Sequence, residues 1–218
     1  RNTVYTVVQV EIDIDMAASS AKSLGRWFPT ATTRKVPRLS ADQRATICLF
    51  YHYVKPAPME RARVQQLKQF LDRLTERLGI GGRIRYAEEG LNCTVSGTSE
   101  AIRAFAARLS GSGPSAFGPE FRDVDFKFID DLPPDRAFKD LRFLPVKELV
   151  FYGVGEDMAP LSKGGVHLRP QQYHAKMMEK DTVIVDVRNS YEAEIGRFTG
   201  QEAAGGAEYI DPKMRKST

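Results

Sequence analysis

Three charged side chains follow an apolar run in the last quarter of the sequence. The run VIVDV carries Asp186 near its end and is followed by Arg188, and Glu192 lies within a short helical pattern after it. A buried strand with polar residues at its carboxyl end, followed by a helix, is the usual place for an α/β active site. The three residues are therefore candidates for active-site support. For Asp186 the alternative is a buried ion pair that holds the strand-to-helix turn.

A second polar pair lies in the segment YAEEGLNCTVSG, where Glu89 and Asn92 flank a glycine. Side chains of these types in a tight turn often hydrogen-bond the neighbouring backbone, which is the structural alternative. Binding of a ligand is the functional one, and both residues are kept as candidates for active-site support.

The two cysteines are poor candidates for a nucleophile, because only a thiolate reacts readily. Cys48 lies within an apolar run, which favours burial, and Cys93 lies close to two carboxylates, which raise the pKa of a thiol. The cysteines and the three histidines also lack the paired spacing of zinc ligands. We therefore expect no metal site and no cofactor.

Basic residues gather in two stretches, although 32 basic and 28 acidic residues give a net charge of only +4. Between Lys22 and Arg44 the only acidic residue is Asp42, and such a stripe attracts phosphates by releasing counterions. A solvated linker and an organellar transit peptide are the alternatives for this stretch. The candidate RNA-binding residues are Arg34, Lys35 and Arg38 in the stripe, and Lys213, Arg215 and Lys216 in the tail.

The composition is that of a globular protein, with 42% hydrophobic and 28% charged residues. The longest apolar runs are far shorter than the ~18 residues that span a bilayer, and no segment has the pattern of a signal peptide. We expect a cytoplasmic protein without a membrane partner, with a mitochondrial location as the alternative.

Residues 45–131 contain strand and helix patterns in the order β-α-β-β-α-β. In the first predicted helix, Leu67, Leu71 and Leu74 recur at spacings of three and four, which marks one buried face, and Gly79 fits the position after its end. Thr98 is a suitable N-cap for the second helix. This order predicts a ferredoxin-like domain with both helices on one face of a four-stranded sheet. The other face would be free for a ligand, RNA or a neighbouring domain.

The other segments flank this domain. Residues 1–44 comprise an alternating strand pattern followed by the basic linker, and residues 132–163 are expected to form an extended connector. Residues 164–218 begin with a helix at Pro170, followed by VIVDV, which we expect to be buried on both faces of a parallel sheet. The predicted fold class is α+β, a ferredoxin-like domain followed by part of an α/β domain.

Three motifs resemble those of one family. DTVIVDVRNSYEAEIGRFTG is similar to the first signature of rhodanese domains, with Arg197 where many relatives have histidine. YAEEGLNCTVSG resembles the Glu-Gly-Ile-Asn-Gly-Thr motif of rhodanese-like tRNA wobble-uridine hydroxylases, with Cys93 in place of a glycine. The tail GAEYIDPKMRKST is similar to one branch of that family. The resemblance covers roughly residues 45 to 218.

The resemblance implies a ferredoxin-like domain followed by the N-terminal half of a rhodanese domain. It also implies a catalytic cysteine in a later loop, where backbone amides lower the pKa of its thiol. The sequence has no such loop, so we expect that cysteine beyond Thr218, no catalytic residue in this chain, and an inactive fragment. A further segment or a partner would complete the half-domain.

The implied function is oxygen-dependent 5-hydroxylation of the wobble uridine, with tRNA as the partner. A sulfurtransferase that carries a persulfide and a non-catalytic scaffold or RNA-associated subunit are the alternatives.

Overall fold

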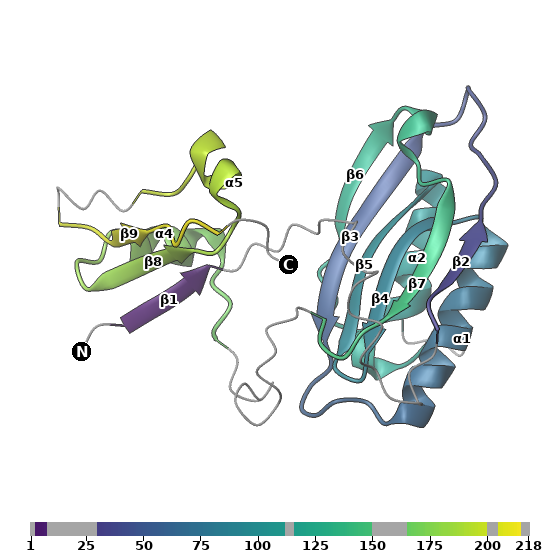
Figure 1. The fold of residues 1–218 in the computed structure, drawn as a ribbon, viewed down its shortest axis with the longest axis horizontal. Coiled ribbons are helices and arrows are strands. Elements are labelled where there is room, and N and C mark those ends of the chain that lie inside the picture. The colour runs from purple at the N-terminus through teal and green to yellow at the C-terminus, as the bar shows by residue number, and fades with distance from the viewer. Residues whose placement is uncertain (1–2, 8–29, 112–115, 150–164, 200–204, 215–218) are drawn as a thin grey trace. The chain divides into compact units, whose positions relative to one another are not determined.

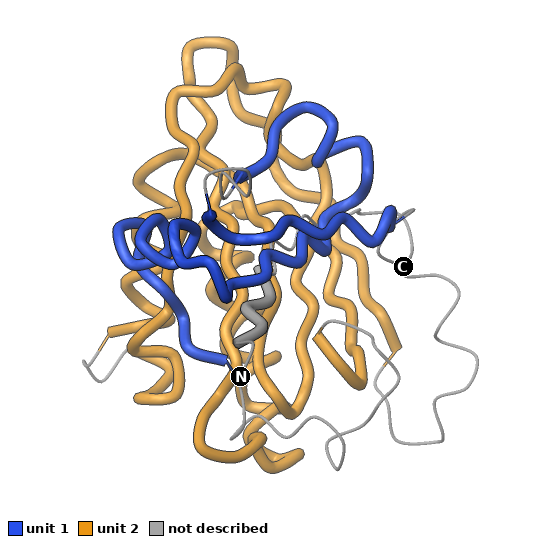
Figure 2. The backbone as a smooth tube through the Cα atoms, turned by 90° about the vertical axis from the view of Figure 1, so that its left-hand side faces the viewer, with its two compact units in different colours: residues 1–19, 163–218 blue, residues 20–162 orange. Residues whose placement is uncertain are grey.

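The computed structural model describes residues 3–7, 30–111, 116–149, 165–199 and 205–214. The chain forms two compact units, shown in Figure 2. Unit 1 comprises residues 1–19 and 163–218, and unit 2 comprises residues 20–162. Each unit has its own sheet, as Figure 1 shows.

Unit 2 contains a six-stranded sheet in the order β2-β7-β4-β5-β3-β6. Four adjacent strands of it, β4-β5-β3-β6, have the order and antiparallel pairing of a ferredoxin-like sheet, as predicted for residues 45–131. Helices α1 and α2 both lie on one side of this sheet (Figure 1). The elements are β2 (Thr32–Lys35), β3 (Ala45–Tyr53), α1 (Arg61–Leu78), β4 (Gly81–Ala87), β5 (Gly90–Gly97), α2 (Ser99–Ser110), β6 (Lys127–Leu132) and β7 (Asp140–Pro145), with short 3₁₀ helices at Pro119–Phe121 and Pro134–Arg136.

The helices of unit 2 begin, end and pack as the sequence predicts. Leu67, Leu71 and Leu74 are buried in one core with the side chains of β3, β4 and β5. Gly79 ends α1 in the left-handed conformation, with φ at 64°. The Thr98 side chain accepts a hydrogen bond from the backbone N–H of Ala101 at the start of α2.

Two strands of this sheet lie where the sequence predicted none. The predicted connector contains β7, which pairs in parallel with β4, and the predicted linker contains β2, which pairs antiparallel with β7. Both segments are short and lie near prolines, so the sequence pattern suggested irregular chain. Leu141 and Phe143 of β7 are buried in the core of unit 2, and this burial favours a strand at the edge that β4 would otherwise expose.

Unit 1 contains a parallel three-stranded sheet in the order β1-β8-β9. Its elements are β1 (Thr3–Val7), α4 (Pro170–Met177), β8 (Thr182–Asp186), α5 (Ser190–Ile195) and β9 (Glu208–Ile210). Pro170 is the first residue of α4, as predicted. Its core cluster comprises Met177, Ile184 and Ala207, with Tyr173 and Tyr209 packed against it.

The structure modifies two expectations about unit 1. The alternating pattern of residues 3–14 is a strand over Thr3–Val7, and residues 8–14 lie outside the described part of the chain. Strand β8 is parallel to both neighbours as expected, but its burial alternates: Ile184 is buried, whereas Val183 and Val185 are only partly covered. Complete burial of a parallel strand requires elements packed on both faces of its sheet, and β8 does not have the burial pattern that such packing produces.

Candidate functional site

The sheet face of unit 2 that is turned away from the helices carries polar side chains in register. Arg85 of β4 lies opposite Asn92 of β5, which in turn lies opposite Tyr51 of β3. Leu144 of β7 continues this row beyond Arg85. Because side chains alternate along a strand, these residues share a face, while the alternating neighbours of Asn92, Leu91 and Cys93, belong to the core. We call this surface the open face.

Asn92 is the most unusual residue of the open face. It is only 2% exposed, yet neither its amide nitrogen nor its amide oxygen has a hydrogen-bond partner among the described residues. A buried polar group without a partner costs about 1–3 kcal/mol, so such groups are rare in folded proteins. The alternative from the sequence, an Asn92 that bonds the local turn, therefore finds no support in the hydrogen bonds of the structure.

Three arginines of β4 and β7 lie on the same face as Asn92. Arg83 forms an ion pair with Asp140 at 2.6 Å and lies opposite Arg142. Arg85 has neither a hydrogen bond nor an ion pair among the described residues, and its partial burial lowers the pKa of its guanidinium. The open face thus carries three arginines against one aspartate in these two strands, and Arg85 is available for a new contact.

The turn before Asn92 fixes the position of β5 closely. Gly90 has a φ of 144°, and a Cβ atom at this residue would lie 2.0 Å from the carbonyl oxygen of His52. A residue with a side chain could therefore not occupy this position without moving β3. Glu89 accepts a hydrogen bond from the backbone N–H of Leu149. The two candidates of this motif therefore differ: Glu89 holds a neighbouring segment, and Asn92 lies unpaired within the sheet.

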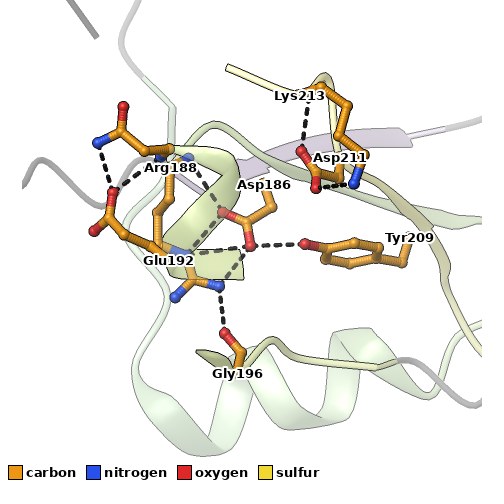
Figure 3. Close-up of polar contacts among 8 residues, drawn as sticks. Asp186, Arg188, Glu192, Gly196, Tyr209, Asp211 and Lys213 are labelled. Atoms are coloured by element: carbon orange, nitrogen blue, oxygen red, sulfur yellow. Dashed lines mark hydrogen bonds and ion pairs between the residues drawn. The ribbon is translucent and has the colours of Figure 1, made fainter. Parts of the chain in front are cut away.

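The second group of candidate residues forms a polar cluster around the turn between β8 and α5 in unit 1 (Figure 3). The Arg188 guanidinium donates to both carboxylate oxygens of Asp186, with Nε–Oδ1 at 2.9 Å and Nη2–Oδ2 at 2.6 Å. It also donates to the carbonyl oxygen of Gly196 at 2.9 Å, which connects the end of β8 to the segment after α5. The Tyr209 hydroxyl of β9 donates to Asp186 Oδ2 at 2.8 Å.

These contacts set the charges of the cluster. The hydrogen bonds from Arg188 lower the pKa of Asp186 to about 2, against the opposing effect of burial. The same pairing raises the pKa of Arg188. Burial and the bond to Asp186 raise the pKa of Tyr209 to about 12. At neutral pH the carboxylate and the guanidinium are therefore both charged and paired with each other. This is the buried ion pair that we expected as the alternative role of Asp186.

Glu192 has a local role in this cluster. Its carboxylate accepts from the backbone N–H of Asn189 at 3.0 Å and from the Asn189 side-chain amide at 2.7 Å, a capping arrangement at the start of α5. Tyr209 was not a candidate from the sequence, since it lies in a later strand and no local pattern connects it to Asp186. The only indication in the sequence was that Tyr209 lies in the segment GAEYIDPKMRKST, which is similar to one branch of the family.

The predicted RNA-binding residues have different environments. Arg34 forms an ion pair with Asp72 at 2.6 Å and donates to the Thr75 hydroxyl at 3.0 Å, so it attaches β2 to α1. Lys35 and Arg38 are exposed. Lys213 forms an exposed ion pair with Asp211 at 3.0 Å, and Arg215 and Lys216 lie outside the described residues.

Both cysteines are fully buried, as expected for structural residues. Burial raises the pKa of Cys48 to about 12 and that of Cys93 well above its ordinary value. For Cys93 burial is the main cause, and the neighbouring carboxylates that the sequence suggested are not. Among the described residues, no group of three His, Cys, Asp or Glu side chains could hold a metal ion. Within the same residues, no helix has the length and apolar character to cross a membrane.

Comparison with known proteins gives consistent matches. Residues 45–149 match the UPF0176 acylphosphatase-like domain. A "tRNA uridine(34) hydroxylase" of Bacillus velezensis is 33% identical over 159 residues, which are 73% of this chain and 45% of that protein. Proteins of the same name from Lactococcus lactis subsp. lactis and Oceanobacillus iheyensis are 34% and 31% identical, over 71% and 74% of this chain and 44% and 46% of theirs.

A solved structure of full-length HypF in the phosphate- and nucleotide-bound form matches with a TM-score of 0.28 and 14% identity. The match covers 54% of this chain and 12% of that chain.

The ferredoxin-like sheet and the family match together define unit 2 as an α+β domain of the acylphosphatase-like class. As its motifs indicated, the chain is similar to proteins named tRNA uridine(34) hydroxylase, and it spans a little under half the length of these curated relatives.

Proposed function

We propose that this chain forms part of an enzyme that hydroxylates C5 of the wobble uridine in tRNA. The observation that carries the proposal is the match to proteins named tRNA uridine(34) hydroxylase at 31–34% identity over more than two thirds of this chain. The chain spans about 45% of the Bacillus velezensis protein, so the activity is proposed for the whole protein that contains it. The expected partner is tRNA, and the oxidant implied by the family is molecular oxygen.

Within this proposal, unit 1 supplies the first part of a rhodanese domain. Its parallel β1-β8-β9 sheet, with α5 directly after β8, is compatible with that assignment. Asp186, Arg188 and Glu192 act as positioning residues in this scheme. They hold the strand-to-helix turn through the contacts of Figure 3 and touch no reacting atom.

The test measures modified nucleosides in cells. A strain that lacks the gene is compared with the parent strain and with the same strain complemented by the intact gene, and tRNA digests are analysed by mass spectrometry. The proposal expects 5-hydroxyuridine and nucleosides derived from it to disappear on deletion and to return on complementation. Unchanged 5-hydroxyuridine refutes it. A loss of 2-thiouridine nucleosides alone would instead identify a sulfurtransferase, and no change in either would favour a scaffold.

A further inference from the structure

The open face of unit 2 presents an unpaired amide, an unpaired guanidinium and an aromatic ring in one cross-strand row. Asn92 lies between Arg85 and Tyr51 in the register of β4, β5 and β3. Tyr51 is 48% exposed and lies near the end of β3, beyond the part of this strand that pairs with β6. One cross-strand row therefore combines an amide, a guanidinium and an aromatic ring. Among the described residues, neither the amide nor the guanidinium has a partner.

We infer that this row binds an unpaired nucleotide of an RNA strand, with Asn92 at the edge of the base, Tyr51 against its ring and Arg85 at its phosphate. The inference rests on the proposed function for the choice of RNA as the ligand. It goes beyond that function by assigning the binding surface to three residues of unit 2.

The chemistry of each residue fits this role. An asparagine amide presents one donor and one acceptor side by side, and it can bond the edge of a base with both. Aromatic side chains on protein surfaces bind unpaired bases by stacking, which tolerates any base. A guanidinium can pair with a phosphate through two parallel hydrogen bonds. In a base-paired helix the Watson–Crick edges are already paired and the ring faces are stacked on neighbouring bases, so this arrangement selects a single strand.

The charge of the surrounding face is favourable for a phosphate backbone. Arg142 extends the positive charge beyond Arg83 and Arg85, and Lys35 of β2 lies opposite Asp140 of β7 in the same face. Asp140 forms an ion pair with Arg83, so its single negative charge offsets only part of the positive charge of this face. Among the described residues Arg85 has no hydrogen bond or ion pair, so its guanidinium can turn towards a phosphate without losing one.

The test is a titration of the 218-residue chain with a short fluorescein-labelled oligouridine, followed by fluorescence anisotropy at several salt concentrations. A hairpin duplex with the same label is the comparison ligand. Tyr51→Ala is expected to raise the Kd for the single strand by roughly tenfold, the usual cost of a lost base–aromatic stack. Arg85→Gln is expected to raise the Kd and to reduce the slope of log affinity against log salt by about 0.7.

Asn92→Ala should also weaken single-strand binding by roughly tenfold, as expected for a lost bidentate contact to a base. The matched control is Arg73→Gln, which removes an exposed arginine of α1 that has no ion pair or hydrogen bond among the described residues. It should keep the Kd and the salt slope of the unaltered chain. Circular dichroism verifies that each variant is folded, and if Asn92→Ala does not fold, the Tyr51 and Arg85 variants decide.

Equal weakening by Arg73→Gln and Arg85→Gln would overturn the inference, since it would indicate diffuse attraction to the whole surface. Equal affinity for the hairpin, unchanged binding in the Tyr51 and Arg85 variants, or no binding at all would overturn it too. The two proposals fail separately. Loss of 5-hydroxyuridine in the deletion strain without an effect of these variants leaves the proposed function intact, whereas variant effects without that loss leave the binding surface intact.

Discussion

Replacing Asn92 with leucine should stabilise unit 2. The two side chains have the same number of heavy atoms and the same branching, and the amide of Asn92 is buried with neither of its polar atoms paired among the described residues. Each unpaired buried group costs about 1–3 kcal/mol, and replacing it with an apolar group of the same shape removes that cost. Asparagine is also disfavoured in strands. We expect the free energy of unfolding to rise by about 1–3 kcal/mol in Asn92→Leu.

The assay is urea denaturation at pH 7, followed by far-UV circular dichroism, with hydrogen exchange of the β3 and β5 peptides to assign the change to unit 2. Thr94→Val is the control, since Thr94 is the next residue of β5 on the open face and is partly exposed. It should change stability by less than about 0.5 kcal/mol, as surface substitutions usually do. A loss of stability above about 1 kcal/mol in Asn92→Leu would refute the reasoning, because it would mean that the amide has a partner in solution.

Three further predictions concern the core, the cluster of unit 1 and the thiols. Leu71→Ala should destabilise unit 2 by about 2–5 kcal/mol in urea melts, since the side chain is fully buried; a loss below about 0.5 kcal/mol would contradict this. The pKa of Asp186 is about 2 in the folded chain against 3.8 ordinarily, so it contributes about 2 kcal/mol above pH 4 that is lost as the pH falls towards 2. Asp186→Asn should remove that contribution at pH 7, measured by hydrogen exchange of β8, while Glu194→Gln should not; equal protection in both variants would be the contrary result. Thiosulfate:cyanide sulfurtransferase activity should be absent from this 218-residue chain, because Cys48 and Cys93 are buried protonated thiols; turnover that is abolished by substituting either one with serine would contradict this.

Local patterns in the sequence were sufficient for the helices of unit 2 and for the ion pair of unit 1. The apolar spacing that includes Leu71 repeats within one helix, and the Gly79 cap depends on a single backbone conformation. Asp186 and Arg188 are two residues apart, so the turn that separates them also brings them together. In each case the interacting residues are neighbours along the chain.

Features that depend on distant segments were not predictable in the same way. Strand β7 pairs with β4 although β5, α2 and β6 lie between them in the chain, and no pattern within DLRFLP identifies that partner. Tyr209 reaches Asp186 only because β8 and β9 are paired. The unpaired amide of Asn92 is a property of three strands together, since its status depends on what β3 and β4 place on either side. The motif YAEEGLNCTVSG identified Asn92 as a candidate, and only the assembled sheet showed that its amide is buried and unpaired.

The parallel pairing of β1 with β8 has a consequence for the order in which the chain is made. Thr3 pairs with Thr182, so unit 2 lies entirely within the loop that this pairing closes. During synthesis at about 5–20 residues per second, unit 2 leaves the ribosome before β8 does. It can therefore fold while β1 still lacks its neighbour. A unit 2 that is already compact shortens the flexible chain between the two strands, and this lowers the entropic cost of joining them.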